Sequence, residues 1–135
     1  MAKPPLAATL SWSGDLKFNA TSGEQTMMLD GNSTVGPSPM QTLAFSIAGC
    51  MAMDVVDILR KGRHDVRGLD VAFDGVRAQS PPNRFTAVTL TFTIHGDIPG
   101  DAVSRAIALS HEKYCSVSNS LRGDITFTTE FEVKL

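Results

Sequence analysis

The spacing of hydrophobic and polar residues changes twice along the chain. Up to about residue 31, short apolar pieces are separated by turn residues, namely Ser13, Gly14 and Asp15 and then Asp30-Gly31. This pattern predicts a β-hairpin followed by a third strand. Apolar residues then recur at helical spacing over 39–61, and strand-like alternation returns after Gly62.

The segment 39–61 predicts a long helix with a defined start. Ser38 suits the N-cap, Pro39 the first helical position, and Gln41 stands three residues after Ser38, as in a capping box. The helix is expected to end near Lys61, before Gly62. Apolar residues cover most of its circumference, so we expect it to be buried on nearly every side. A chain of this size can hardly bury such a helix alone, which predicts a partner chain.

The remaining segments predict strands and a second helix. One strand places Leu69, Val71 and Phe73 on one face, and the next places Val88, Leu90, Phe92 and Ile94 on one face. A helix starting near residues 99–101 has an inward stripe of Val103, Ala106, Ile107, Ser110 and Tyr114. A last strand turns Phe127, Thr129, Phe131 and Val133 inward. The order predicts an α+β fold with a mainly antiparallel sheet, in one domain over residues 1–135.

Composition narrows the classes of function. The chain has 135 residues, a net charge of -2 and a pI near 5.8, which argues against a general nucleic-acid binder. No uninterrupted apolar run reaches the roughly 18 residues of a membrane span, and the N-terminus lacks a signal-peptide pattern. We therefore expect a cytoplasmic protein without membrane contact. Metal-binding and nucleotide-binding motifs are absent, so no cofactor or metal is expected.

Cys50 lies in the narrow polar stripe of the first helix, one turn after Ser46 and one turn before Asp54. It is either an inert core thiol or a nucleophile that is partly shielded from water. A nucleophile must be a thiolate, and the charge of Asp54 would raise the thiol pKa. A cation is therefore needed, from this chain or from a second copy, and the candidates are Arg63, Arg84, Arg105 and Arg122. Arg84 is the first choice because it opens a strand next to an irregular loop.

Cys115 lies at the end of the second helix, 65 positions after Cys50. His111, one turn earlier, would stabilise a Cys115 thiolate if protonated, or is an ordinary half-exposed helical histidine. Glu112 is expected to face solvent, with a supporting acid as its alternative role. In a reducing compartment the two cysteines are either core thiols or a redox pair.

Two segments, "GPSPMQTLAFSIAGCMAMDVVDILRK" and "LSHEKYCSVSNSLRGDITF", resemble the OsmC/Ohr superfamily of osmotically inducible and organic hydroperoxide resistance proteins. The first matches the family's N/S-P-x-[EQ] helix start with a cysteine about ten residues later. The second matches the signature C-x-x-S-N-x-x-R-G. The resemblance covers essentially the whole chain. It implies the OsmC-like fold, with sheets packed on two helices, in an intertwined homodimer with two active sites at the interface.

The resemblance also implies thiol peroxidase chemistry in the response to oxidative stress. Cys50 would attack an organic hydroperoxide and become a sulfenic acid, Cys115 would condense with it into a disulfide, and an external dithiol would reduce the pair. We therefore expect the two cysteines to lie within bonding reach.

Two features depart from the pattern of the family's peroxidases. Those enzymes have an N-terminal arginine at the thiolate and a helix-start glutamate that holds the arginine. This chain has no arginine before Cys50, and Met40 or Gln41 occupies the glutamate's place, which makes Gln41 a possible supporting residue. These departures keep a second hypothesis open. It is a non-catalytic dimer that binds a small apolar ligand or senses oxidation.

Overall fold

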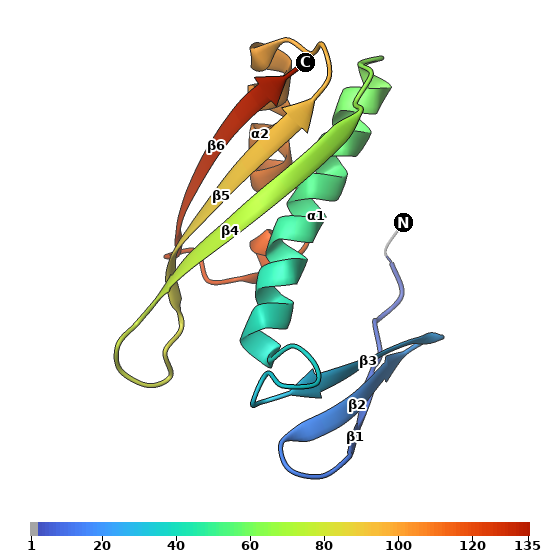
Figure 1. Cartoon of the computed structure of the whole chain (residues 1–135), viewed down its shortest axis with the longest axis vertical. Helices are drawn as coiled ribbons and strands as arrows, with labels where there is room; N and C mark the ends of the chain where they lie inside the picture. The colour runs from blue at the N-terminus through green and yellow to red at the C-terminus, as the bar shows by residue number, and fades with distance from the viewer. Residues whose placement is uncertain (1–2) are drawn as a thin grey trace. The chain divides into compact units, whose positions relative to one another are not determined.

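The computed structural model describes residues 3–135, which form two compact units (Figure 1). The first unit ends at Leu43, and the second covers Ala44–Leu135. The elements follow in the order β1, β2, β3, α1, β4, β5, α2 and β6, with a π turn and a 3-10 turn between α2 and β6. The predicted α+β class is confirmed, with two three-stranded sheets and two main helices.

The first unit contains the predicted hairpin and third strand. β1 (Thr9–Trp12) pairs antiparallel with β2 (Lys17–Ser22), which pairs antiparallel with β3 (Gln25–Asp30). Gly14 and Asp15 turn the chain with positive φ angles of 99° and 49°, a conformation that glycine and aspartate tolerate better than most residues. The indole Nε1 of Trp12 donates to the carbonyl of Asp15 at 2.8 Å and closes the turn.

The buried carboxylate of Asp30 organises the loop after β3. It accepts backbone N–H groups from Asn32 at 2.9 Å, Thr34 at 3.1 Å and Val35 at 3.0 Å. These hydrogen bonds, with those of Val35 and Asn32 the strongest influences, hold the pKa of Asp30 below its ordinary value. We call residues 30–35 the Asp30 loop.

The predicted capping box at the helix start is confirmed. Ser38 Oγ accepts the Gln41 N–H at 3.2 Å, and Gln41 Oε1 accepts the Ser38 N–H at 2.9 Å. Gln41 Oε1 also accepts the hydroxyl of Ser33, which ties the cap to the loop before it. An N-cap of this kind contributes about 1 kcal/mol to helix stability. The side chain of Gln41 thus has a structural use.

Helix α1 (Pro39–Lys61) buries only one of its sides within the chain. The buried residues, spaced four apart, are Ile47, Met51, Val55 and Leu59. Phe45 is 63% exposed and Met53 is 73% exposed. Within the single chain the helix is therefore buried on one side only, as expected for a chain of this size. Burial of its other sides by a partner chain stays a prediction.

The length and composition of α1 also suit a membrane span, with an 18-residue window of mean hydropathy 1.7. The sequence analysis expected no membrane span, because it looked for an unbroken run of apolar residues and not for a high mean hydropathy over a window. Core helices of soluble proteins satisfy the same test, and 22% of this window is buried within the single chain.

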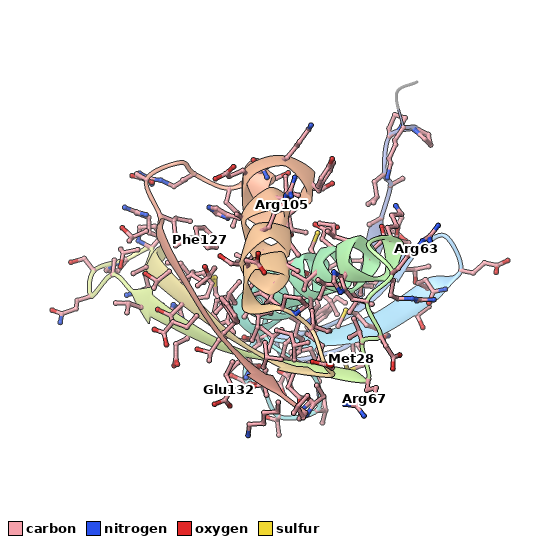
Figure 2. All side chains as sticks on the ribbon, turned by 90° about the horizontal axis from the view of Figure 1, so that it is seen from above. Met28, Arg63, Arg67, Arg105, Phe127 and Glu132 are labelled. Carbon is pink, nitrogen blue, oxygen red and sulfur yellow. The ribbon has the colours of Figure 1, made fainter. Side chains whose placement is uncertain are left out.

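The second sheet has the order β4 (Gly68–Arg77), β5 (Phe85–His95), β6 (Thr126–Lys134). β4 pairs antiparallel with β5, whereas β5 pairs parallel with β6, because the chain crosses back through α2 between them. The predicted core face of β5 is confirmed, since its four named residues are all buried. α2 and the second-unit part of α1 lie on one face of this sheet (Figures 1 and 2).

Strand β6 matches its prediction only in part. Phe127 lies on the helix-bearing side of the sheet, and Glu132 lies on the opposite side (Figure 2). However, Thr129 is exposed and Phe131 is 38% exposed, so these two predicted inward residues are not core residues. β6 is an edge strand, and α2 covers its inner face incompletely.

Helix α2 (Gly100–Leu109) continues into a π turn over Ser110–Tyr114. The stripe of Val103, Ala106, Ile107 and Ser110 is buried as predicted, but Tyr114 is 52% exposed. An α-helix would place Tyr114 below Ser110, whereas the wider π turn places Cys115 there, with its N–H donating to the Ser110 carbonyl at 2.7 Å. This turn makes Cys115 fully buried.

Candidate functional site

The structure brings Cys50, Asp54 and Cys115 together inside the second unit. The two sulfurs and a carboxylate oxygen of Asp54 all lie within 4.8 Å of one another. Cys50 and Asp54 are one helical turn apart on α1, and the π turn aims Cys115 at them from the other helix. Both cysteines are free thiols, Cys115 buried and Cys50 half-buried. The expected proximity of the two thiols is confirmed.

Backbone N–H groups from the loop after the π turn reach both sulfurs. The Ser118 N–H donates to Cys115 Sγ at 3.3 Å, and the Val117 N–H donates to Cys50. The Asn119 side chain fixes this loop by donating to the Cys115 carbonyl at 2.8 Å and to the His111 carbonyl at 3.1 Å. We call residues 115–119 the Cys115 loop.

Asp54 is held in place by a residue that the sequence analysis assigned only to the core. The buried Ser110 Oγ donates to Asp54 Oδ2 at 2.8 Å. Ser110 and the N–H groups of Val117 and Ser118 were missed as parts of the site. The spacing Cys115-x-x-Ser118 was the available signal, because such a short loop can return its own N–H groups to the cysteine.

The pKa of Cys50 is raised above its ordinary value. Burial is the largest cause, the Val117 N–H acts in the opposite direction, and Cys115 and Asp54 raise the pKa further. No cation is among these influences within residues 3–135. The expected rise from Asp54 is therefore present, and an activating cation, if it acts, has to come from a partner chain, which stays a prediction.

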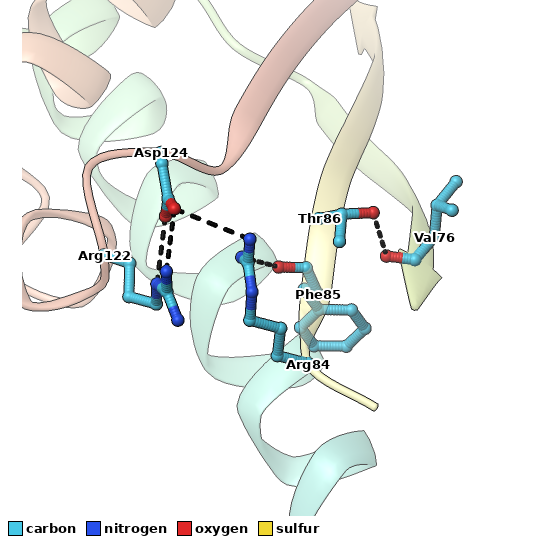
Figure 3. Close-up of polar contacts among 6 residues, drawn as sticks. All are labelled: Val76, Arg84, Phe85, Thr86, Arg122 and Asp124. Atoms are coloured by element: carbon cyan, nitrogen blue, oxygen red, sulfur yellow. Dashed lines mark hydrogen bonds and ion pairs between the residues drawn. The ribbon is translucent and has the colours of Figure 1, made fainter. Parts of the chain in front are cut away.

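The predicted cation Arg84 is engaged elsewhere in the chain (Figure 3). Its Nη1 donates to the Phe85 carbonyl at 3.0 Å, and its Nη2 lies 3.5 Å from Asp124 Oδ2. Arg122, another candidate, donates to the same carboxylate through Nε at 3.0 Å and Nη2 at 2.8 Å. Both arginines therefore contact the same Asp124 carboxylate. Arg105 lies on α2 and Arg63 follows the end of α1, as Figure 2 shows.

The two remaining candidates lie beside the Cys115 loop. Glu112 is exposed, as expected. His111 is half-buried, its ring lies 4.7 Å from that of Phe127, and its Nδ1 is buried without a hydrogen-bond partner among the described residues. It lines a cavity of about 230 Å³ together with Ser118 and Arg122. His111 is thus half-buried on its helical turn, and its role stays a prediction.

Comparisons with known proteins find similar sequences and similar folds. A family described as OsmC-like protein matches residues 30–130. Protein YhfA of Escherichia coli strain K12 is 41% identical over 132 residues, which cover 95% of this chain and 98% of that protein. The crystal structure of a hypothetical protein from Aquifex aeolicus VF5 is 26% identical, covers 98% of both chains and has a TM-score of 0.90.

A more distant structure has a more informative name. It is described as an organic hydroperoxide resistance protein OsmC and predicted redox protein from Legionella pneumophila. It is 17% identical, covers 100% of both chains and has a TM-score of 0.70, so it shows a shared fold.

Proposed function

Because the chain belongs to the OsmC-like protein family, we propose that it is a cysteine-based thiol peroxidase that reduces organic hydroperoxides. The observation that carries the proposal is the pair of free thiols within 4.8 Å of each other. The name of the Legionella structure, an organic hydroperoxide resistance protein, supports the choice of substrate class. Cys50 is the attacking thiol because it is half-buried, whereas Cys115 is fully buried and inaccessible to a peroxide.

The proposed reaction has three steps. The Cys50 thiolate attacks the distal oxygen of the hydroperoxide, so an S–O bond forms and the O–O bond breaks. The alkoxide that leaves takes up the proton that the Cys50 thiol released on ionisation, and departs as the alcohol. The Cys115 thiolate then attacks the Cys50 sulfur, an S–S bond forms and water leaves. An external dithiol reduces the disulfide by thiol–disulfide exchange.

The surroundings of the two thiols suit the second step better than the first. The sulfurs must close from at most 4.8 Å to the roughly 2.05 Å of a disulfide, which side-chain rotation and small backbone shifts can supply. The first step requires a Cys50 thiolate, which burial and Asp54 disfavour. Turnover should therefore accelerate as the pH rises, unless a partner subunit supplies a cation.

A homodimer is part of this proposal. Phe45 and Met53 are large apolar side chains of α1 that the single chain leaves exposed, and burying them against a second α1 would remove apolar surface from water. Light scattering should return about twice the 14.4 kDa mass of one chain. The double variant Phe45→Glu/Met53→Glu should be monomeric, while Leu135→Glu, at an exposed apolar residue outside α1, should remain dimeric. A monomeric unmodified protein would contradict this part.

A cytoplasmic setting completes the proposal, because the reaction requires a pool of reduced dithiol between turnovers. Cumene hydroperoxide consumption with a dithiol reductant tests the activity. We expect turnover in the unmodified protein and none with Cys50→Ser. With Cys115→Ser, assayed without the dithiol, we expect one equivalent of peroxide consumed and a trappable sulfenic acid at Cys50. Equal rates for the unmodified and Cys50→Ser proteins would refute the peroxidase.

The raised pKa of Cys50 favours one second candidate, a sensor of oxidation. In such a protein the pair would be oxidised slowly, without efficient turnover. A disulfide that forms with peroxide but is not reduced by dithiols on the timescale of the assay would identify this alternative.

A further inference from the structure

The site contains three possible metal-ligand atoms at nearly the spacing that a tetrahedral metal site requires. Cys50 Sγ, Cys115 Sγ and an Asp54 oxygen lie within 4.8 Å of one another. In a tetrahedral zinc site with Zn–S bonds of about 2.3 Å, the two sulfurs are about 3.8 Å apart. The required closure is about 1 Å or less, which small side-chain rotations supply.

The chemistry of the donor set selects the class of ion. Thiolates are soft ligands that prefer Zn²⁺ and similar ions, whereas Mg²⁺ and Ca²⁺ prefer sites built only from oxygen. Two thiolates and one carboxylate carry three negative charges, of which a divalent ion offsets two. Three protein ligands also leave a fourth tetrahedral position for water or an external thiol.

The groups behind these ligands are those that support metal sites in proteins. The Ser110 hydroxyl fixes the orientation of the Asp54 carboxylate through its 2.8 Å hydrogen bond. The Val117 and Ser118 N–H groups donate to the two sulfurs and remain available to metal-bound thiolates. Asn119 holds the Cys115 loop that presents these groups.

We propose that the reduced protein binds one thiophilic divalent ion, such as Zn²⁺, through Cys50, Cys115 and Asp54. Binding requires only the reduced thiols and does not rest on peroxidase activity. Metal and disulfide exclude each other, because the S–S bond removes two of the three ligands. The bound ion should also shield Cys50 from peroxides and alkylating agents.

Cobalt binding tests the site without any enzyme assay. Co²⁺ is added to the reduced protein under anaerobic conditions, and thiolate-to-cobalt charge-transfer absorption is recorded. We expect saturation at one ion per chain and loss of the band when Zn²⁺ displaces Co²⁺. The azo compound diamide should prevent binding, since it takes two electrons and two protons from the thiol pair and leaves a disulfide. Absence of the band in the reduced protein, or an equal band after oxidation, would overturn the proposal.

Variants then test each ligand. Asp54→Asn should weaken Zn²⁺ affinity more than Ser110→Ala, for which about a tenfold loss is typical of an outer supporting group. Asp57→Asn is the matched control, because Asp57 lies on the same helix but is exposed and pairs with Lys61 at 2.9 Å. Equal affinity of Asp54→Asn and Asp57→Asn would overturn the three-ligand site. The comparison of reduced and oxidised unmodified protein does not depend on the folding of any variant.

Discussion

The Asp30 loop and the Cys115 loop both direct backbone N–H groups at a side chain that can carry negative charge, with opposite results. Asp30 receives three N–H groups, and its pKa is lowered. Cys50 receives the Val117 N–H, while burial, Cys115 and Asp54 all oppose its ionisation, and its pKa is raised. The comparison teaches that N–H donation from a loop favours the charged form of a side chain only where it is the strongest influence. At Asp30 it is, and the carboxylate holds its loop together. At Cys50 burial and the neighbouring Cys115 and Asp54 outweigh it, and the thiol stays protonated.

The largest effect should come from removing the Asp30 carboxylate. Asp30→Ala leaves three loop N–H groups without their acceptor, so the loop that leads into the Ser38 cap should lose its structure. We expect a clear fall in the midpoint of thermal unfolding, followed by circular dichroism. Glu24→Ala, an exposed acid in the same unit, is the control and should behave like the unmodified protein. Equal midpoints for Asp30→Ala and Glu24→Ala would show that the loop does not depend on this carboxylate.

The pH dependence of stability tests the lowered pKa of Asp30. The folded pKa of Asp30 is lowered below the unfolded value of about 3.9, so the folded state binds this proton less tightly. Its stabilisation is complete above the unfolded pKa and is lost as the pH falls through the folded pKa. The stability difference between the unmodified protein and Asp30→Asn, measured by urea unfolding, should be constant near neutral pH and shrink in acid. A constant difference down to the lowest pH would argue against the lowered pKa.

Alkylation of Cys50 tests the raised pKa of this thiol. In Cys115→Ser only one thiol remains, and burial, the main cause of the raised pKa, persists. The alkylation rate should reach half its maximum above the ordinary cysteine pKa of about 8.5. The rate is measured against pH with a chelator present. A midpoint well below 8.5 would instead reveal an activating cation that the single chain does not place at Cys50.

The smallest effect concerns Asp54 alone. Replacing it in the Cys115→Ser background with Asp54→Asn removes one charge that raises the pKa of Cys50. Alkylation near neutral pH should become faster, but only modestly, because Asp54 is the smallest of the influences on the pKa of Cys50. The exposed control Asp57→Asn should leave the rate unchanged. A slower reaction in Asp54→Asn would mean that Asp54 assists ionisation.

Local patterns predicted the regular parts of the fold, and tertiary packing decided the rest. Ser38 and Gln41 define the helix start within four residues, and the alternation along β5 identifies its buried face without further information. The π turn is different, because one extra residue in a helical turn leaves no periodic signal. Because of this turn Cys115, and not Tyr114, faces inward below Ser110, and a candidate thiol thereby lies in the site.

Charge pairing was equally hard to predict. Arg84 was a reasonable partner for Cys50 by residue type, but its actual partner is Asp124, 40 positions later in the chain. The cysteine pair was predictable only through the family resemblance. Ser110 and the N–H groups of the Cys115 loop were not, because their role depends on how α2 ends.

The double hydrogen bond of Asn119 has a kinetic consequence. By fastening the Cys115 loop at the His111 and Cys115 carbonyls, it keeps the second thiol beside the first, so that the pair reacts at a high effective concentration. In the proposed reaction a Cys50 sulfenic acid would then be captured before another peroxide could reach it. A short lifetime for that intermediate protects the sulfur from irreversible oxidation to the sulfinic acid.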